Sequence, residues 1–308
     1  MATPSRQNAQ NCRVFIPTLH SEPYPAIDPS TVTLGVPYVA CIIGGRGAAG
    51  PGLARSYARA GATGLVLASR KLSSLDEVAA EIRTINPASK VVTTQCDISS
   101  NSDAERLAGT IQSEFNGHLD TVVVNAGFSG PIIPDVVQES PSDFQSALNV
   151  NTVGAFHAAH HLLPLLLETQ SPAMSFIAIC SMGAATVGGP LAHSHYCVSK
   201  AAQARLIEVI SEQYADRGLF CASVHPGGMR GGLAKDVKAL PKEIAHMMDD
   251  GPDLVGSFCV WLSTPNATRR RSALNGRFLS CKWDSEELEA RFDDIQENDL
   301  LRFRIAVD

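Results

Sequence analysis

The sequence predicts a single α/β domain: a doubly wound parallel sheet of about seven strands, with helices on both faces. Short apolar runs without polar alternation recur along the chain, as expected of strands that helices cover on both sides. Each run is followed by a longer helical stretch, and such alternation is typical of a parallel sheet. The chain has 308 residues, of which 44% are hydrophobic. That length and composition are sufficient for one large buried core.

The predicted elements follow one another from residue 37 to about residue 283. The strands are short runs rich in Val, Ile, Leu and Ala: Val39–Ile43, Leu65–Ala68, Val91–Gln95, Thr121–Val124, Ser175–Ile179, Phe220–Val224 and Phe278–Leu279. The helical stretches between them lie near residues 51–60, 73–85, 102–115, 142–167, 197–216 and 251–263. A short basic run before the last strand, Arg269–Arg271, is predicted to be a solvated loop.

The two ends of the chain differ from this pattern. Residues 1–36 are irregular, because prolines interrupt every candidate helix, although Asn11–Ile16 could form a short edge strand. We interpret residues 1–36 as an N-terminal extension that is draped over the core or partly disordered. Residues 284–308 are polar and charged. We expect this C-terminal tail to form a helix that packs on the surface of the core.

Composition and charge exclude several classes of protein. The chain has 31 acidic and 25 basic residues and a net charge of −6, so it lacks the basic footprint of a nucleic-acid-binding protein. Its apolar stretches are shorter than the roughly 20 residues of a membrane span, and residues 1–10 lack the apolar stretch of a secretory signal. We therefore expect no nucleic-acid or membrane partner and a cytoplasmic location. Eight scattered cysteines without a C-x-x-C pair are expected to be small buried hydrophobes.

A glycine-rich turn follows the first predicted strand. Gly45, Gly47 and Gly50 give the spacing G-x-G-x-x-G immediately before a helical stretch. Glycines at such a turn let the backbone approach a pyrophosphate, and the helix N-terminus supplies N–H donors. An ordinary tight turn is the alternative, since the motif alone is weak. Its place after the first strand of an alternating pattern favours a dinucleotide site.

The residues after the second predicted strand indicate which dinucleotide binds. An acidic side chain at this point would bind the ribose 2′-hydroxyl of NAD. The chain instead has Ser69, Arg70 and Lys71. A guanidinium can pair with a 2′-phosphate, so Arg70 predicts NADP(H) as the cofactor. The alternative is a solvated pair of charges at a strand end.

The strongest catalytic signal is Tyr196 followed by Lys200 on one helical stretch. Residues four apart share a helix face, so the phenol and the ammonium project together. A nearby cation favours phenolate and is expected to lower the pKa of the tyrosine towards a useful range for proton transfer. Ser181 ends a predicted strand 15 residues earlier, and Asn151 lies 45 residues before Tyr196 on the preceding helical stretch.

With these motifs in order, residues 37–283 resemble the short-chain dehydrogenase/reductase family. The segment Leu274–Ser280, followed by Lys282, Trp283 and Asp284, is similar to that of members acting in filamentous-fungal secondary metabolism. The resemblance implies a Rossmann-fold catalytic domain over residues 37–283, with a substrate lid at about 229–250. It also implies a homodimer or homotetramer that assembles through the helices near 142–167 and 197–216.

The resemblance further implies the roles of individual residues. Tyr196 would protonate a carbonyl oxygen, Lys200 would lower the pKa of that tyrosine, Ser181 would hydrogen-bond the substrate oxygen, and Asn151 would hold a proton-relay water. Two residues depart from the family's glycine turn, Ile43 in place of threonine and Ala48 in place of the middle glycine. The cofactor-binding residues implied are Gly44, Arg46, Gly47, Gly50, Ser69, Arg70, Asp97, Ile98, Asn125, Ala126, Gly127, Tyr196, Lys200, Pro226 and Gly227.

The leading functional prediction is an NADP(H)-dependent oxidoreductase that reduces a ketone or aldehyde to an alcohol, or catalyses the reverse, on a small apolar biosynthetic intermediate. A dehydratase, isomerase or cyclase on the same fold stays open, as does a non-catalytic binding protein. The altered glycine turn supports the non-redox enzyme, and the intact catalytic residues oppose it. Loss of Tyr196 or Lys200 would favour the binding protein, and neither is lost.

Several histidines could bind a metal ion or line the substrate pocket. No metal site is expected, because no carboxylate or cysteine near His157, His160 and His161 completes a ligand set. His193 and His195 flank the approach to Tyr196 and line either the substrate pocket or a surface loop.

Overall fold

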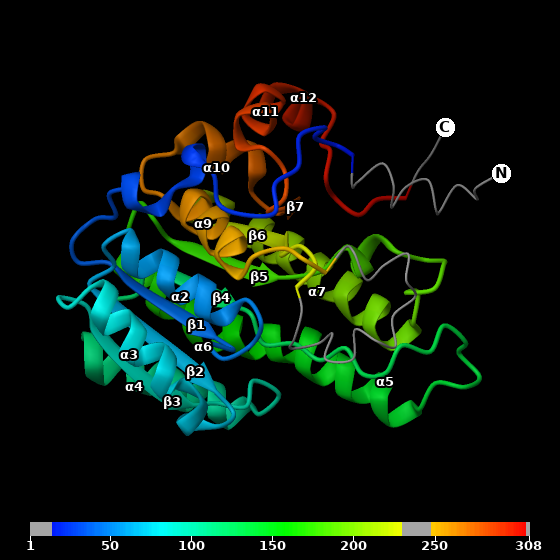
Figure 1. The fold of residues 1–308 in the computed structure, drawn as a ribbon, viewed down its shortest axis with the longest axis horizontal. Coiled ribbons are helices and arrows are strands. Elements are labelled where there is room, and N and C mark those ends of the chain that lie inside the picture. Colours follow the sequence, from blue (N-terminus) through cyan, green and yellow to red (C-terminus); the bar gives the residue numbers. More distant parts are fainter. Residues whose placement is uncertain (1–13, 230–247, 306–308) are drawn as a thin grey trace.

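The computed structural model describes residues 14–229 and 248–305. Its centre is a seven-stranded sheet with the order β3-β2-β1-β4-β5-β6-β7, and every pair of neighbours is parallel (Figure 1). The strands are β1 (Val39–Ile43), β2 (Gly64–Ser69), β3 (Lys90–Gln95), β4 (Thr121–Val124), β5 (Ser175–Ile179), β6 (Phe220–His225) and β7 (Arg277–Ser280). All seven predicted strands are therefore confirmed, each within one residue at either end.

The chain winds away from β1 in both directions. β2 and β3 lie on one side of β1, while β4 and all later strands lie on the other. Ile43, the last residue of β1, pairs with Ala68 on one side and with Val124 on the other. In a doubly wound sheet the crevice outside the carboxyl ends of the strands at this reversal is the usual ligand site.

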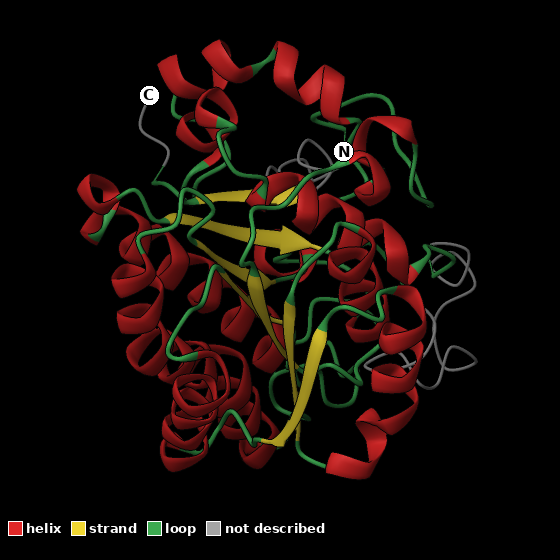
Figure 2. Cartoon of the chain, turned by 90° about the vertical axis from the view of Figure 1, so that its left-hand side faces the viewer, coloured by secondary structure: helices red, strands yellow, loops and turns green. Residues whose placement is uncertain are grey.

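Helices cover both faces of the sheet, as Figures 1 and 2 show. The apolar side chains of the strands alternate between two cores, with Ile42 in one and Ile43 in the other. The first core is closed by α2 (Gly50–Arg59), α3 (Asp76–Ile85) and α9 (Pro252–Ser263), and the second by α4 (Asn101–Phe115), α6 (Gly154–Thr169) and α7 (Ser194–Gln213). Strands buried on both faces explain the apolar runs in the sequence.

The helix predicted over residues 142–167 is interrupted. It consists of α5 (Pro141–Ala147), a π-helical segment η4 (Leu148–Val153) and then α6. π-Helical turns are rare in proteins, and those that occur often lie at functional sites. This one contains Asn151. The predicted helix at 73–85 also differs, since it begins as a 3₁₀ turn, η3 (Leu72–Leu75).

Residues 14–36 pack onto the core in an irregular conformation. They contain two proline-initiated 3₁₀ turns, η1 (Pro25–Ile27) and η2 (Pro29–Thr31), and the side chains of Ile16, Ile27 and Leu34 are buried. The predicted strand over Asn11–Ile16 is wrong for residues 14–16, which form a turn, while residues 11–13 lie outside the described part of the chain. The strand-like contact is instead an antiparallel bridge between Leu19 and Trp283.

The C-terminal part forms three short helices instead of a loop and one tail helix. α10 (Thr268–Leu274) contains the whole basic run, so the prediction of a solvated loop there was wrong. Within it, Arg270 stacks over the Trp261 ring at 3.8 Å, and Arg271 donates to the carbonyl oxygen of Met174 at 2.6 Å. The tail forms α11 (Ser285–Ala290) and α12 (Phe292–Glu297).

The cysteines pack as small core residues, as predicted. The seven cysteines between residues 14 and 305 that the structure describes are buried and unpaired.

None of the described helices is long and apolar enough to cross a membrane.

Candidate active site at the carboxyl edge of the sheet

The glycine turn between β1 and α2 leaves no room for side chains at two positions. Gly44 has a φ of +92°, and a Cβ there would lie 2.6 Å from the amide nitrogen of Ala126. A Cβ at Gly50 would lie 2.4 Å from the backbone of Gly45. The turn is closed by hydrogen bonds from Gly47 N to Gly44 O (3.0 Å) and from Gly50 N to Gly47 O (2.8 Å). This close-packed backbone at a helix N-terminus fits a dinucleotide pyrophosphate.

The loop after β4 is bonded directly to the glycine turn. The side-chain amide of Asn125 donates to Gly44 O at 2.7 Å, and Ala126 N donates to Ile43 O at 2.8 Å. Gly127 continues this loop across the same edge of the sheet. The predicted group Asn125, Ala126 and Gly127 therefore lies beside the predicted pyrophosphate site.

Two cations lie at the β2 side of the turn. Gly44 N and Gly45 N donate to Ala68 O at 2.8 and 3.0 Å, which ties the turn to the end of β2. Arg46 follows Gly45 within the glycine turn. Arg70 directly follows Ser69, the last residue of β2. Both arginines are exposed, and neither forms an ion pair with a residue that the structure describes. The corner is thus positively charged and open to an anionic group.

The remaining predicted cofactor residues lie along the same edge. Asp97 and Ile98 follow β3; the Asp97 carboxylate accepts from Ser99 N at 3.0 Å, and a Cβ at Gly154 would meet the Ile98 side chain. Pro226 and Gly227 follow β6. Gly227 has a φ of +81°, and the next amide donates to the carboxylate of Asp250 at 2.7 Å. Five strands, β1, β2, β3, β4 and β6, therefore bring these predicted cofactor residues to one edge, and the remaining two, Tyr196 and Lys200, lie on α7.

Tyr196 and Ser181 are brought together from α7 and from the end of β5. The Ser181 hydroxyl lies close enough to the Tyr196 phenol to lower its pKa. Burial has the larger effect and raises the pKa of Tyr196 above its ordinary value. Gly183 leaves space for the phenol ring, because a Cβ there would lie 3.1 Å from Tyr196 Cε1.

Lys200 does not act on Tyr196 as the sequence suggested. Its side chain is buried, and the ammonium donates to Ile179 O at 2.8 Å and to Gln203 Oε1 at 3.0 Å. Burial lowers the pKa of Lys200. The expected lowering of the Tyr196 pKa by this cation is therefore corrected: the pKa is raised, because desolvation of the phenol dominates and the ammonium is engaged by the strand end.

Asn151 ties the loop after β4 to the catalytic helix. Its side-chain nitrogen donates to Phe128 O at 2.8 Å and to Ser199 Oγ at 2.9 Å, while its oxygen accepts from Phe128 N at 2.8 Å. Both amide hydrogens are thus bonded to protein atoms, and the relay-water role that the resemblance implied stays a prediction. In this structure the side chain positions the Phe128 loop against α7.

The histidines near Tyr196 are buried. Of the two placements that the sequence left open, a surface loop is therefore excluded for both. His193 and His195 are 4% and 1% exposed, and the His193 ring stacks on the Tyr196 ring with centroids 5.2 Å apart and planes at 7°. Sequence reasoning missed their partner, Glu139, whose carboxylate lies 2.8 Å from His195 Nδ1. These residues are 56 apart in the chain, and no local pattern signals such a pair.

Two histidines of α6 form side-chain hydrogen bonds. His157 Nδ1 lies 3.1 Å from Ile98 O, and His161 Nε2 lies 2.9 Å from Asn101 Oδ1. Within residues 14–229 and 248–305, no group of three or more His, Cys, Asp or Glu side chains could hold a metal ion. The predicted lid at 229–250 lies for the most part outside the described residues.

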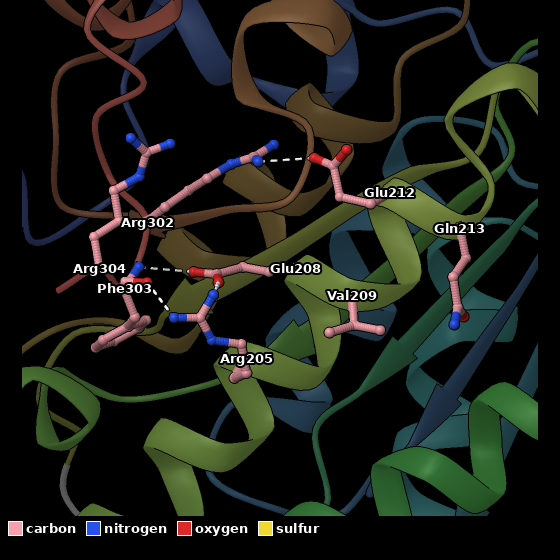
Figure 3. A pocket seen from close by; sticks show the side chains of 8 residues that line it. All are labelled: Arg205, Glu208, Val209, Glu212, Gln213, Arg302, Phe303 and Arg304. Carbon is pink, nitrogen blue, oxygen red and sulfur yellow. Dashed lines mark hydrogen bonds and ion pairs between the residues drawn. The ribbon is translucent and has the colours of Figure 1, made fainter.

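A separate hollow of about 300 Å³ lies between α7 and the C-terminal tail, as Figure 3 shows. Its charged side chains are engaged with one another: Arg302 pairs with Glu212 at 2.7 Å, and Glu208 accepts from Phe303 N at 2.8 Å. It contains none of the predicted site residues. We therefore regard it as packing between the tail and α7, and we place the candidate active site at the carboxyl edge of the sheet.

Comparison with known proteins shows the family of the chain. A family model described as short chain dehydrogenase matches residues 38–241. Short chain dehydrogenase pgmD of Aspergillus terreus is 32% identical over 303 residues, which cover 95% of this chain and 94% of that protein. Short chain dehydrogenase pigC of Monascus ruber is 28% identical and covers 93% and 92% of the two chains.

Solved structures share the fold. A levodione reductase superposes with a TM-score of 0.70 at 20% identity, over 80% of this chain and 96% of that chain. A short chain dehydrogenase of Shigella flexneri complexed with NADP superposes with a TM-score of 0.68 at 24% identity, over 79% and 96%.

Proposed function

The chain belongs to the short chain dehydrogenase family, a family of oxidoreductases that use a nicotinamide cofactor, and from this premise we propose that it is an NADP(H)-dependent carbonyl reductase. The observation that carries the proposal is that the Ser181 hydroxyl lies close enough to the Tyr196 phenol to lower its pKa, with Lys200 one helical turn further on. These three side chains lie at the same sheet edge as the glycine turn. The reaction is the reduction of a ketone or aldehyde to an alcohol, or its reverse.

The choice of NADP(H) over NAD(H) rests on charge. The 2′-phosphate of NADP carries two negative charges. In this fold the ribose that bears it binds near the end of β2. Arg46 and Arg70 are the exposed cations at that corner, and neither is engaged by a described carboxylate. A guanidinium binds phosphate in a bidentate manner, which an exposed side chain can do without first breaking an ion pair.

The residues of the site divide the chemistry among them. Bound NADPH would supply the hydride that reduces the carbonyl carbon. The raised pKa keeps the Tyr196 phenol protonated at neutral pH, so it can donate a proton to the carbonyl oxygen. The Ser181 hydroxyl orients that oxygen and the phenol together. A protonated phenol favours the direction of reduction, because oxidation would require the phenolate as base.

The sequence left non-redox alternatives open. They rested on the substitutions at Ile43 and Ala48, which could have deformed the phosphate turn. The turn nevertheless keeps its two internal hydrogen bonds and its bonds to Ala68. We therefore keep reduction as the proposed reaction and assign no dehydratase, isomerase, cyclase or scaffold role.

The test of this function is NADPH consumption with a panel of ketones and aldehydes, followed at 340 nm for the wild type and for Tyr196→Phe. Consumption by the wild type that the variant lacks supports the proposal. A wild type that binds NADPH and reduces no member of the panel, yet converts a biosynthetic intermediate without redox change, would favour a dehydratase or isomerase.

We also propose a biological role, a cellular location and an oligomeric state. The fungal relatives and the C-terminal motif Leu274–Ser280 support a role in secondary metabolism, with a small apolar intermediate as substrate. We propose a cytoplasmic homodimer or homotetramer assembled through α6 and α7. Exposed apolar side chains on those helices, Phe156, Val198 and Val209, support this assembly. Light scattering of the purified protein and cell fractionation test both statements.

A further inference from the structure

The start of the catalytic helix is capped by a residue from another part of the chain. The first residue before α7, His193, provides no side-chain cap. The Glu139 carboxylate does so instead: it accepts from the backbone N–H groups of Ser194 and His195, the latter at 3.0 Å. A carboxylate at a helix N-terminus is stabilised by the free N–H groups and the helix dipole. Glu139 therefore binds the end of α7 that carries Tyr196.

A single imidazole binds both ends of the loop after β4. His195 Nδ1 lies 2.8 Å from Glu139 Oε2, and Nε2 lies 2.6 Å from Ser129 O. Both partners are acceptors, and only an imidazolium can donate to both at once. The side chains of His195 and Glu139 are 0% and 4% exposed. Gly130 permits this contact, since a Cβ there would lie 2.6 Å from His195 Nε2.

The same cluster contacts the ring of Tyr196. The His193 ring packs edge-on against His195, with centroids 4.7 Å apart, and face-on against Tyr196 at 5.2 Å. Burial lowers the pKa of His193, which favours the neutral ring. A continuous chain of contacts thus runs from the Glu139 carboxylate through His195 and His193 to the phenol ring of Tyr196.

We propose that Glu139 and His195 are positioning residues for Tyr196: the buried pair fixes the start of α7 to the loop after β4 and so holds the phenol at Ser181. The kinetic consequence rests on the proposed reductase function, whereas the positional consequence does not. Removing the charge of Glu139 leaves His195 and two N–H groups short of an acceptor in a buried site. The start of α7 then shifts or frays, and Tyr196 moves with it.

The chain offers a matched control at the opposite edge of the sheet. Asp120, just before β4, is 2% exposed at its side chain and accepts from Val39 N at 2.7 Å and from His118 Nε2 at 2.8 Å. It is a buried carboxylate bonded to a backbone N–H and a histidine, like Glu139, and it contacts no catalytic residue. Asp120→Asn therefore reproduces the loss of a buried pair without touching Tyr196.

The experiment compares Glu139→Gln with Asp120→Asn in the full chain. Tyrosine labelled with ¹³C at Cζ gives five signals, and Tyr196→Phe identifies the signal of Tyr196. We expect Glu139→Gln to shift or broaden that signal and Asp120→Asn to leave it unchanged. With NADPH and a reducible ketone, Glu139→Gln should lower kcat at least tenfold and raise the solvent isotope effect on kcat, with the NADPH Kd within twofold of the wild type.

Each outcome decides the proposal. An unchanged Tyr196 signal in Glu139→Gln overturns it, as does an equal loss of kcat in both variants. If Glu139→Gln does not fold, His195→Gln breaks the same pair from its other side and is judged by the same signal. A wild type that reduces no carbonyl defeats the proposed function alone, because the Tyr196 signal still reports on its position.

Discussion

The Ser181 hydroxyl, just after β5, lies close enough to the Tyr196 phenol, in the first turn of α7, to lower its pKa. This contact joins the sheet edge that carries the glycine turn to the helix that carries Lys200. Burial of the phenol has the larger effect and raises its pKa.

Loss of the Tyr196 hydroxyl should abolish most turnover. General acid catalysis contributes about 10²–10⁴-fold in rate, so we expect Tyr196→Phe to lower kcat by that factor. The NADPH Kd should change little, because the glycine turn and the cations near β2 are untouched. Steady-state kinetics and calorimetry measure the two quantities. Turnover within threefold of the wild type would contradict the assignment.

Arg70 should determine the preference between the two dinucleotides. Arg70→Ala removes a charged hydrogen-bond donor, worth about 1.5–3 kcal/mol, so the NADPH Kd should rise at least tenfold while the NADH Kd stays constant. Lys71→Ala is the matched control one residue further on, and we expect less than a threefold effect on either. Equal weakening of both cofactors by Arg70→Ala would show that Arg70 does not contact the 2′-phosphate.

A methyl group at Gly50 should block the phosphate turn. Its Cβ would lie 2.4 Å from the backbone of Gly45, so Gly50→Ala must displace the turn and should weaken NADPH binding at least tenfold. Gly109→Ala in α4 is the control, because its Cβ meets no atom within 4 Å; it should stabilise the protein by about 0.5–1 kcal/mol. Calorimetry and thermal melting report the two effects. Unaltered NADPH affinity in Gly50→Ala would remove the turn from the site.

Asn151 should matter for both stability and rate. Asn151→Ala leaves the amide and carbonyl of Phe128 without partners, at a cost of about 1–3 kcal/mol in unfolding free energy. Because the Phe128 loop then loses its tie to α7, kcat should also fall. The control is Asn149→Ala, which removes only an exposed bond with Gln145, and we expect a change below about 0.5 kcal/mol. Urea unfolding and kinetics of both variants test this, and equal stability of the two would refute it.

The Glu139 pair should give a defined dependence of stability on pH. Burial alone would raise the pKa of Glu139, but the hydrogen bonds from His195 and Ser194 outweigh it and lower the pKa from 4.5 to about 2. A carboxylate with a depressed folded pKa stabilises the fold above its unfolded pKa, and the contribution is lost as the pH falls through the folded value.

The difference in unfolding free energy between the wild type and Glu139→Gln, about 1–3 kcal/mol, should therefore be complete above about pH 5 and vanish near pH 2. Urea titrations at several pH values measure it, and other carboxylates cancel in the difference. A difference that grows on acidification would have the wrong sign for a pair of this kind.

The sheet could be predicted from the sequence because most of its strands are buried on both faces and therefore largely apolar, as in Val39–Ile43 and Ser175–Ile179. The edge strand β3 is the partly exposed exception. The π-helical segment around Asn151 could not be predicted in this way. Its cause is tertiary, since the Asn151 side chain is bonded to Phe128 and to Ser199. Composition between residues 142 and 167 shows only a long helical stretch.

The candidate site divides in the same manner. Residues fixed by strand ends, such as Gly44 and Ser181, could be placed from spacing alone, and the structure brings them to one edge. Contacts that depend on distant loops could not, as the Glu139–His195 pair and the engagement of Lys200 by Ile179 show. The basic run at Arg269–Arg271 misled for a related reason, because stacking on Trp261 makes a charged helix face compatible with burial.

The central claim is that this edge of the sheet binds NADP(H) for carbonyl reduction. Calorimetric titration of the purified wild type with NADPH and NADH, side by side, tests it most directly. We expect NADPH to bind at least tenfold more tightly than NADH. If neither cofactor binds, the glycine turn has no dinucleotide ligand, and the reductase function fails however well Ser181 and Tyr196 are arranged.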